Sequence, residues 1–267
     1  MKKYLFFLAA FAMMLASCNR SEKDVNAFDV TTFTVEDSLQ FPPEMIEEWM
    51  NSDMANYLTV VDVPETENEA LRDNIINWIG TLLSENYDGD SQDVKAMVDF
   101  DKNEFLNLET GAPNSHFQQF IKLVEENDRY VSYCDEGWIY MGGAHGTSFK
   151  QGATFNKTNG DRFTYKMFKD PEALADRIKD ALEKQYFEPI LDGYDVTFEQ
   201  AIYSEAFESF PLSEAEPWIR NDSVFFVYGD YEIAAYVFGM PECGIPYEKL
   251  KADLTDDGKA FFEPVSK

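Results

Sequence analysis

Trp138-Ile-Tyr-Met-Gly-Gly-Ala-His-Gly-Thr147 is the stretch of sequence that decides the fold. An apolar run leads into Gly142 and Gly143, and a second alternating run begins after the last glycine. Glycine accepts positive φ angles and carries no side chain, so these residues allow a tight reversal between two strands. We therefore expect two strands joined by a glycine turn, with His145 held close to the backbone of that turn.

The segments on either side of this turn alternate between apolar and polar residues, as strands do. The alternation covers Arg129–Glu136 before the turn and Phe149–Phe155 after it, and Asn159-Gly160 supplies a further tight turn. Runs rich in β-branched residues at 30–35 and 57–63 predict two earlier strands. The chain is therefore expected to build antiparallel sheet around the glycine turn.

Three other segments carry apolar residues at helical spacing. Thr66-x-x-Glu69 has the pattern of a capping box and predicts a helix over residues 67–84. Asp170-Pro171 predicts the start of another helix, which Pro189 is expected to end. The apolar residues at 117–124 predict a third, shorter helix. Helices packed on antiparallel sheets give an α+β fold.

Acidic clusters at residues 88–93, 99–104 and 253–258 invite comparison with calcium loops. The first two lack the glycine of the EF-hand loop, and the third lacks its final glutamate. His116 and His145 fall on different predicted elements without neighbouring cysteine pairs, so the ligand spacing of a zinc site is also missing. We expect solvated loops, and neither a metal nor another cofactor.

The first residues have the features of a bacterial lipoprotein signal peptide. Two lysines precede a short apolar run that ends in Leu-Ala-Ser before Cys18, and this arrangement is typical of a secretory leader rather than of a domain helix. We expect residues 1–17 to be removed, Cys18 to be acylated, and residues 18–27 to form a flexible polar tether. The predicted location is the cell envelope, with the chain anchored by lipid in the outer membrane; an uncleaved membrane helix or a buried first helix is the alternative.

The composition limits the partners of the chain. It has 50 Asp and Glu against 22 Lys and Arg, which gives a formal net charge of −28. Such a charge repels nucleic acid and anionic lipid headgroups, and it attracts a basic protein. The alternative is that the acidity serves only solubility. Aromatic residues make up 15% of the chain, enough to supply a sizeable core.

Several blocks carry a resemblance to a known family. They are Tyr140-x-Gly-Gly-Ala-His145, the Asn159-Gly turn with the residues 163–168 that follow it, Tyr231-Glu-Ile-Ala-x-Tyr236, and Ile245-Pro-Tyr-x-x-Leu250. In this order they resemble the extracytoplasmic region of the anti-sigma factor RsiV and the non-catalytic N-terminal region of the peptidoglycan deacetylase PdaC. The resemblance implies two α+β halves that meet near residues 156–160.

The expected organisation follows from these blocks. Residues 28–157 would form a PdaC-like half, residues 158–254 a half like the C-terminal part of RsiV, and residues 255–267 a tail. Because RsiV is a receptor for lysozyme, the resemblance implies recognition of lysozyme or another basic protein that acts on the cell wall.

The sequence offers little support for catalysis. His145 could act as a base, but there is no Gly-x-Ser-x-Gly, no His-Glu-x-x-His, and no protease signature around Cys134 or Cys243. Whether these two cysteines pair is left open by their spacing. We therefore predict a non-enzymatic binding or sensing module. Its candidate ligand-binding residues are Gly142, Gly143, His145, Tyr231, Glu232 and Tyr236. The alternative is a hydrolase of cell-wall glycan or peptide that uses His145 with nearby carboxylates.

Overall fold

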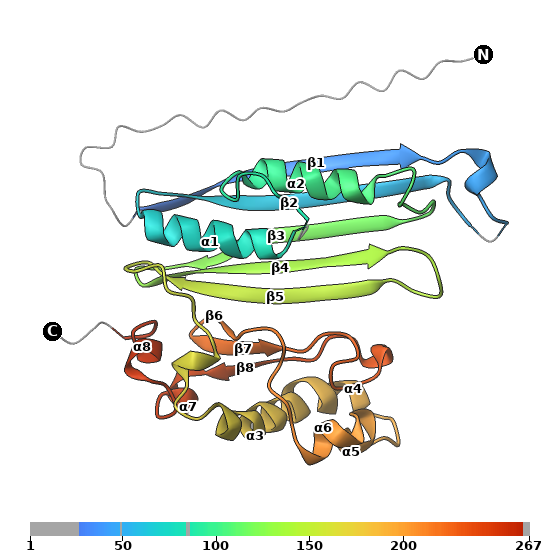
Figure 1. Cartoon of the computed structure of the whole chain (residues 1–267). Helices are drawn as coiled ribbons and strands as arrows, with labels where there is room; N and C mark the ends of the chain where they lie inside the picture. Colours follow the sequence, from blue (N-terminus) through green and yellow to red (C-terminus); the bar gives the residue numbers. More distant parts are fainter. Residues whose placement is uncertain (1–26, 49, 84–85, 264–267) are drawn as a thin grey trace.

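The computed structural model describes residues 27–48, 50–83 and 86–263 (Figure 1). The predicted leader and Cys18 lie outside the described residues, as does nearly all of the predicted tether. The described chain forms a five-stranded sheet and a three-stranded sheet, with helices beside each of them (Figure 1). The α+β class predicted from the sequence is confirmed.

The five strands of the larger sheet lie side by side in the order in which they occur in the chain. They are β1 Phe28–Gln40, β2 Met54–Thr66, β3 His116–Glu126, β4 Tyr130–Tyr140 and β5 Thr147–Asn156. The strand pairs β1/β2, β3/β4 and β4/β5 are antiparallel, which confirms the meander predicted around the glycine turn. Strands β2 and β3 are parallel, because two helices fill the connection between them and allow the chain to cross over.

Strand β3 occupies the segment in which we expected a short helix. Phe117 and Ile121 are four residues apart and share one face both in a helix and in a strand, so their spacing does not separate the two. A register shift between Leu123 and Glu125 also breaks the strand alternation. Hydrogen bonding to strands on both sides decides the conformation, and that pairing depends on distant residues.

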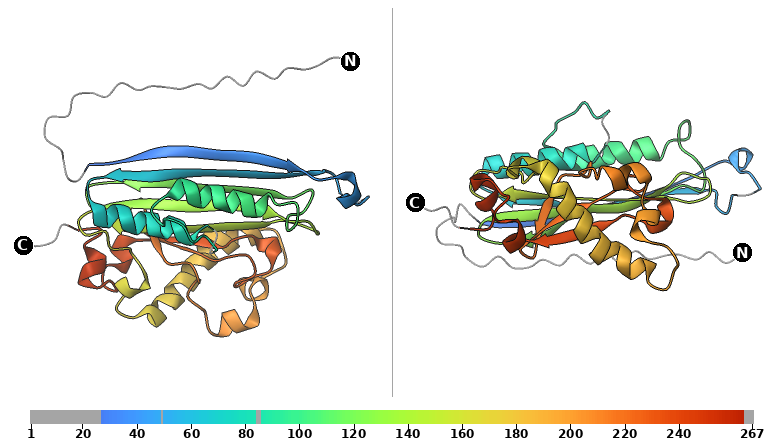
Figure 2. Two further views of the ribbon diagram at one scale, coloured as in Figure 1. Left: turned by 45° about the horizontal axis from the view of Figure 1, so that its top comes forward. Right: turned by 90° about the horizontal axis from the view of Figure 1, so that it is seen from below.

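Helices α1 (Glu69–Thr81) and α2 (Val94–Phe105) cover one face of the larger sheet (Figures 1 and 2). The predicted capping box at Thr66 does not form; Asn68 caps α1 by accepting a hydrogen bond from the Leu71 amide. Helix α2 lies where we expected solvated loops. Its N-cap is an aspartate, Asp93, which shows that part of the acidic cluster serves helix initiation.

The second sheet is antiparallel and consists of β6 Trp218–Arg220, β7 Ser223–Val227 and β8 Glu242–Pro246. Helix α3 (Pro171–Leu182) begins at the predicted Asp170 cap. Helical conformation continues beyond α3 through a π-helical turn, Glu183–Phe187, into α4 (Glu188–Leu191), so Pro189 does not end it. The other α-helices of the described residues are short: α4 Glu188–Leu191, α5 Phe198–Ala201, α6 Ser204–Glu208, α7 Tyr247–Leu250 and α8 Asp256–Lys259. Three 3-10 helices lie at Pro43–Met45, Tyr165–Met167 and Tyr236–Phe238.

Two hydrophobic clusters accompany the two sheets. One joins the larger sheet to α1 and α2, and the other joins the smaller sheet to α3 and the segments after it. The second cluster contains Phe261 and Phe262, although we expected a tail from residue 255 onward. The ring of Phe261 packs edge-on against that of Phe163, with ring centroids 5.2 Å apart. The burial of Phe261 and Phe262 fixes residues 255–263 to the second cluster.

The smaller sheet packs beside β5, the edge strand of the larger sheet, and its strand β6 contacts β5 and β4 (Figure 1). The indole of Trp218 lies directly over Gly152, where an added Cβ would come within 2.2 Å of the ring. Beside this contact, the Ile219 amide donates a hydrogen bond to the Thr154 hydroxyl at 2.7 Å. Among residues 27–48, 50–83 and 86–263, no helix covers the rest of the sheet face opposite α1 and α2 (Figure 2).

Of the helices within residues 27–48, 50–83 and 86–263, none combines the length and the apolar character that crossing a membrane requires.

Candidate functional site

The glycine turn lies between β4 and β5, as predicted. Gly142 and Gly143 have φ angles of 96° and 92°, which residues with side chains rarely adopt. The Tyr140 hydroxyl donates a hydrogen bond to the Gly143 carbonyl at 3.0 Å. At Gly146, an added Cβ would lie 2.4 Å from the indole of Trp138. The turn is therefore fixed against the end of β4 by the aromatic residues of that strand.

His145 is exposed in this turn, and two tyrosines of the C-terminal half contact its ring. Its Nδ1 lies 2.9 Å from the Gly146 carbonyl, which assigns the proton to Nδ1 and leaves Nε2 as an acceptor. The imidazole stacks on Tyr236 with ring centroids 4.0 Å apart. The Tyr231 hydroxyl lies 3.4 Å from Nε2. The structure thus brings His145 together with two candidate tyrosines that lie about 90 positions further along the sequence.

Tyr231 and Glu232 differ in what they offer a ligand. Tyr231 is 52% exposed and has a φ of 66°, an unusual conformation that turns its ring toward Tyr236. Glu232 accepts hydrogen bonds from the backbone amides of Gly229 and Glu214, at 2.7 and 2.8 Å. Burial raises the pKa of this carboxyl although both amides act to lower it. Glu232 therefore holds the loop in place, and Tyr231 is the side chain that faces outward.

The contacts of His145 bear on the hydrolase alternative. Within the described part of the chain, its ring bonds only to a backbone carbonyl and a tyrosine hydroxyl, and to no carboxylate, serine or cysteine. A histidine base normally lies within hydrogen-bonding reach of a nucleophile or of an orienting carboxylate. The arrangement found here presents a flat aromatic surface instead.

The sheet face opposite α1 and α2 carries further aromatic side chains. We call it the open face and define it by the outward side chains of β2, β3 and β4, namely Leu58, Val60, His116, Gln118, Phe120, Trp138 and Tyr140. The strand register aligns Leu58, Gln118 and Trp138 in one row, and Val60 and Phe120 in the next. All of these side chains except Gln118 are half-buried, and Gln118 is exposed. The rings of Trp138 and Tyr140 are stacked with centroids 5.9 Å apart.

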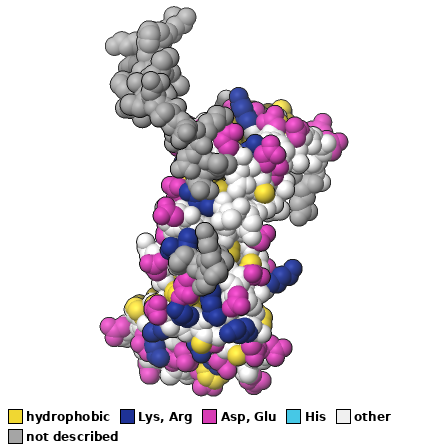
Figure 3. All heavy atoms as spheres, turned by 90° about the vertical axis from the view of Figure 1, so that its left-hand side faces the viewer, with side chains coloured by type: hydrophobic (Ala, Val, Ile, Leu, Met, Phe, Trp, Pro, Cys, Tyr) yellow, Lys and Arg dark blue, Asp and Glu magenta, His cyan; other side chains and the backbone are white. Residues whose placement is uncertain are grey.

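The positive charges around the open face are paired, whereas two of its negative charges are not. Its lysines are neutralised: Lys122 pairs with Asp62 at 2.9 Å, and Lys150 pairs with Glu242. Glu36 and Glu136 are exposed on the same face and have no ion pair among the described residues. The open face is therefore an apolar and aromatic centre with negative charge at its border. Asp and Glu side chains are also spread over the side of the molecule seen in Figure 3.

Sequence reasoning did not find the open face, although it singled out the glycine turn beside it. The helix predicted over residues 117–124 would place Gln118 and Phe120 on different sides. Trp138 and Tyr140 were read as part of a strand, without the face to which they point. The polarity of residues 118–122, Gln-Gln-Phe-Ile-Lys, does not alternate, so the sequence carried no local signal for this strand face.

The two cysteines do not form a disulfide. Cys134 and Cys243 are both free and buried, and burial raises the pKa of each thiol to about 12. A thiol with such a pKa is a poor nucleophile. In the ranges 27–48, 50–83 and 86–263, no group of three or more His, Cys, Asp or Glu side chains is arranged to hold a metal ion.

Comparison with known proteins adds a family description and a fold. Residues 166–248 match the sequence model of a family described as "Protein of unknown function (DUF3298)". A crystal structure of a DUF3298 family member from Bacteroides fragilis superimposes with a TM-score of 0.64 at 19% identity, over 92% of this chain and 100% of that one. A DUF3298 family protein from Pseudomonas aeruginosa gives a TM-score of 0.52 at 14% identity, over 86% of this chain and 96% of that one. No curated protein matches.

The chain is therefore similar to DUF3298 proteins in its C-terminal half and shares their fold over most of its length. The match is consistent with the resemblance to RsiV and PdaC.

Proposed function

We propose that this chain is a non-enzymatic binding module of the bacterial cell envelope, anchored through acylated Cys18, and that the open face docks a basic protein such as lysozyme. The face has the composition that protein interfaces favour, with aromatic residues at its centre and charged residues at its rim. The resemblance to the RsiV and PdaC regions supports the choice of a cell-wall enzyme as the partner.

The observation that carries this proposal is the charge pattern of the open face. Glu36 and Glu136 are unpaired among the described residues, whereas Lys122 and Lys150 are neutralised by Asp62 and Glu242. An approaching protein therefore meets negative charge around an apolar centre. With the net charge of −28, this favours a cationic partner and disfavours an acidic one.

Binding of lysozyme to the full chain in detergent can be measured by calorimetry, with Trp138→Ala as the test variant. Loss of a central aromatic anchor typically costs about 2 kcal/mol or more, so we expect at least about a thirtyfold rise in Kd. Tyr194→Ala is the control, because Tyr194 is 73% exposed and lies outside the open face. Equal affinities for the two variants would show that the open face is not the docking surface.

The electrostatic part of the proposal has its own measurement. The double variant Glu36→Gln/Glu136→Gln should weaken binding and reduce its dependence on salt, because exposed charges are screened over about 10 Å at 0.1 M salt. Asp176→Asn/Asp192→Asn makes the same change in net charge on the other half of the chain and should have the smaller effect. If the two double variants behave alike, only the total charge matters.

Two further experiments address the anchor and the hydrolase alternative. Labelling of cells with a radioactive fatty acid should mark the parent chain and not Cys18→Ser, and unlabelled parent protein would contradict lipidation.

His145→Ala should leave any turnover of cell-wall fragments unchanged. A loss of turnover caused by this substitution would favour the hydrolase.

A further inference from the structure

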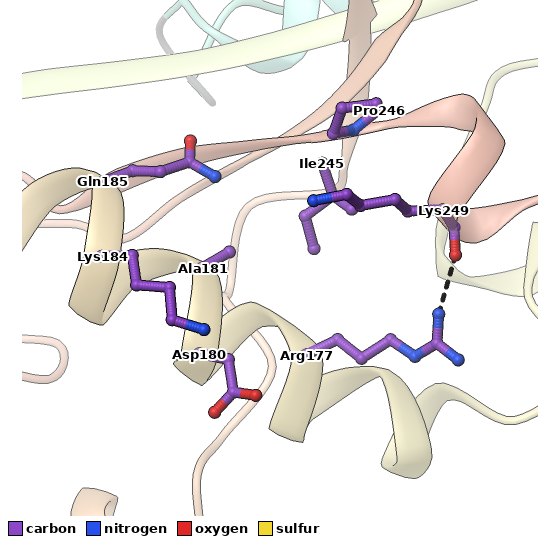
Figure 4. A pocket seen from close by; sticks show the side chains of 8 residues that line it. All are labelled: Arg177, Asp180, Ala181, Lys184, Gln185, Ile245, Pro246 and Lys249. Atoms are coloured by element: carbon purple, nitrogen blue, oxygen red, sulfur yellow. Dashed lines mark hydrogen bonds between the residues drawn. The ribbon is translucent and has the colours of Figure 1, made fainter.

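A groove in the C-terminal half lies away from the open face, between α3 with its π-helical turn and the segment formed by β8 and α7 (Figure 4). Its volume is about 440 Å³, within the usual range of sites for small ligands. The lining includes three apolar residues, Ala181 from α3 and Ile245 and Pro246 from β8. The groove is therefore large enough to hold a small organic molecule and offers it apolar contacts from both walls.

Hydrogen bonds join the two walls near both ends of the groove. At one end, the Gln185 side-chain amide donates to the Gly244 carbonyl at 3.0 Å and accepts from the Gly244 amide at 3.1 Å. At the other end, the Arg177 guanidinium donates to the Lys249 carbonyl at 2.8 Å and pairs with Asp253 at 2.8 Å. These hydrogen bonds and this ion pair fix the distance between the two walls, so the groove is a preformed feature of the fold.

The π-helical turn shapes one wall. Residues Glu183–Phe187 form this turn directly after α3, and Lys184 and Gln185 belong to it. A π-helical turn holds one residue more than an α-helical turn, which rotates the side chains that follow, and such turns are frequent at functional sites. The turn brings the Gln185 side chain into hydrogen-bonding contact with Gly244 of β8, and it leaves Lys184 on the rim of the groove.

The charges of the groove differ from those of the molecule as a whole. Lys184 and Lys249 approach from opposite walls (Figure 4), and neither has an ion pair in the part of the chain that the structure describes. Arg177 is neutralised by Asp253. Asp180 is the one carboxylate in the lining; it points away from Lys249 (Figure 4) and forms no ion pair with Lys184. The groove thus keeps free positive charge in a chain of net charge −28.

We propose that this groove binds a small organic anion, a carboxylate or phosphate monoester with an apolar body. The anionic group lies between the ammonium groups of Lys184 and Lys249, and the apolar body lies on Ala181, Ile245 and Pro246. The site is independent of the open face and of any protein partner docked there.

The test is a titration of the full chain in detergent, followed by amide NMR shifts, with phenyl phosphate and benzoate as probes. Benzyl alcohol supplies the same ring without charge, and inorganic phosphate supplies the charge without the ring. We expect at least one of the two organic anions to shift the amides of residues 177–185 and 244–249. Lys184→Gln/Lys249→Gln should weaken its binding about tenfold or more, the loss expected when charge-assisted hydrogen bonds are removed.

The control is Lys95→Gln/Lys166→Gln, which removes two exposed lysines elsewhere in the chain and should leave the affinity unchanged. Three results would overturn the proposal. The first is that neither organic anion shifts the groove amides, and the second is that inorganic phosphate or benzyl alcohol binds as well as they do. The third is that the two double variants bind the probe equally.

Discussion

Replacement of Asp135 by asparagine should stabilise the protein at neutral pH and leave it unchanged in acid. Asp135 is 2% exposed, on the helix-covered side of β4. Burial raises the pKa of its carboxyl from 3.8 to about 7, although hydrogen bonds from Gln119 and Gln151 act in the opposite direction. The Gln119 amide donates to Oδ1 at 3.0 Å, and an asparagine oxygen can accept the same bond.

The sign and size of the effect follow from the two pKa values. Because the pKa of Asp135 is higher in the folded state than in the unfolded state, the proton favours folding. The contribution of Asp135 to stability is fully present below about pH 3.8 and is lost as the pH rises through about 7. A difference of about three pKa units corresponds to an upper limit of about 4 kcal/mol. The asparagine side chain of the variant carries no charge at any pH and avoids this loss.

Urea unfolding between about pH 4 and 8, followed by tryptophan fluorescence, measures the difference between the parent and Asp135→Asn, and the titration of other carboxylates cancels in that difference. The variant should be more stable near pH 8, and its advantage should shrink toward zero near pH 4. Asp176→Asn removes an exposed carboxylate from α3 and serves as the control for net charge. A pH-independent difference between the parent and Asp135→Asn would refute the reasoning.

Three further predictions concern the turn, the C-terminal segment and the cysteines. Gly146→Ala should lower stability by about 1–3 kcal/mol in chemical denaturation, because its Cβ would overlap the Trp138 indole; an unchanged midpoint would contradict this packing. Phe261→Ala should cost about 3–5 kcal/mol, because the ring is 1% exposed, and stability like the parent's would restore the tail that we expected from the sequence. Cys134 and Cys243 should react with iodoacetamide only after unfolding, since both are buried with a thiol pKa of about 12; mass spectrometry of the native protein would reveal early labelling.

Local patterns predicted the parts of this fold that depend on neighbouring residues. The glycine turn, the antiparallel pairing of β4 and β5 on either side of it and the Asp170 cap of α3 all follow from short stretches of sequence. Strand β3 was mistaken for a helix because Phe117 and Ile121 suit both periods, and the pairing that decides between them involves β2, more than fifty residues earlier. The parallel pairing of β2 and β3 required knowledge of α2, which the acidic cluster concealed.

Only one part of the candidate site, the cluster around His145, was predictable from the sequence. The resemblance to a known family drew attention to His145, Tyr231 and Tyr236, and the structure places these rings together. Their role in binding remains a prediction. The open face could not be recognised while its central strand was taken for a helix. The charge asymmetry of that face depends on which lysines find partners, and the partner of Lys150 lies about 90 residues away.

Hydroxyl-radical footprinting of the full chain, alone and with lysozyme, tests the docking of a basic protein on the open face most directly, because oxidation reports the exposure of individual side chains. We predict that lysozyme protects Trp138 and Tyr140 from oxidation and leaves Tyr194 unaffected. Equal oxidation of Trp138 and Tyr140 in the two samples, at lysozyme concentrations that saturate binding, would contradict the proposed docking surface.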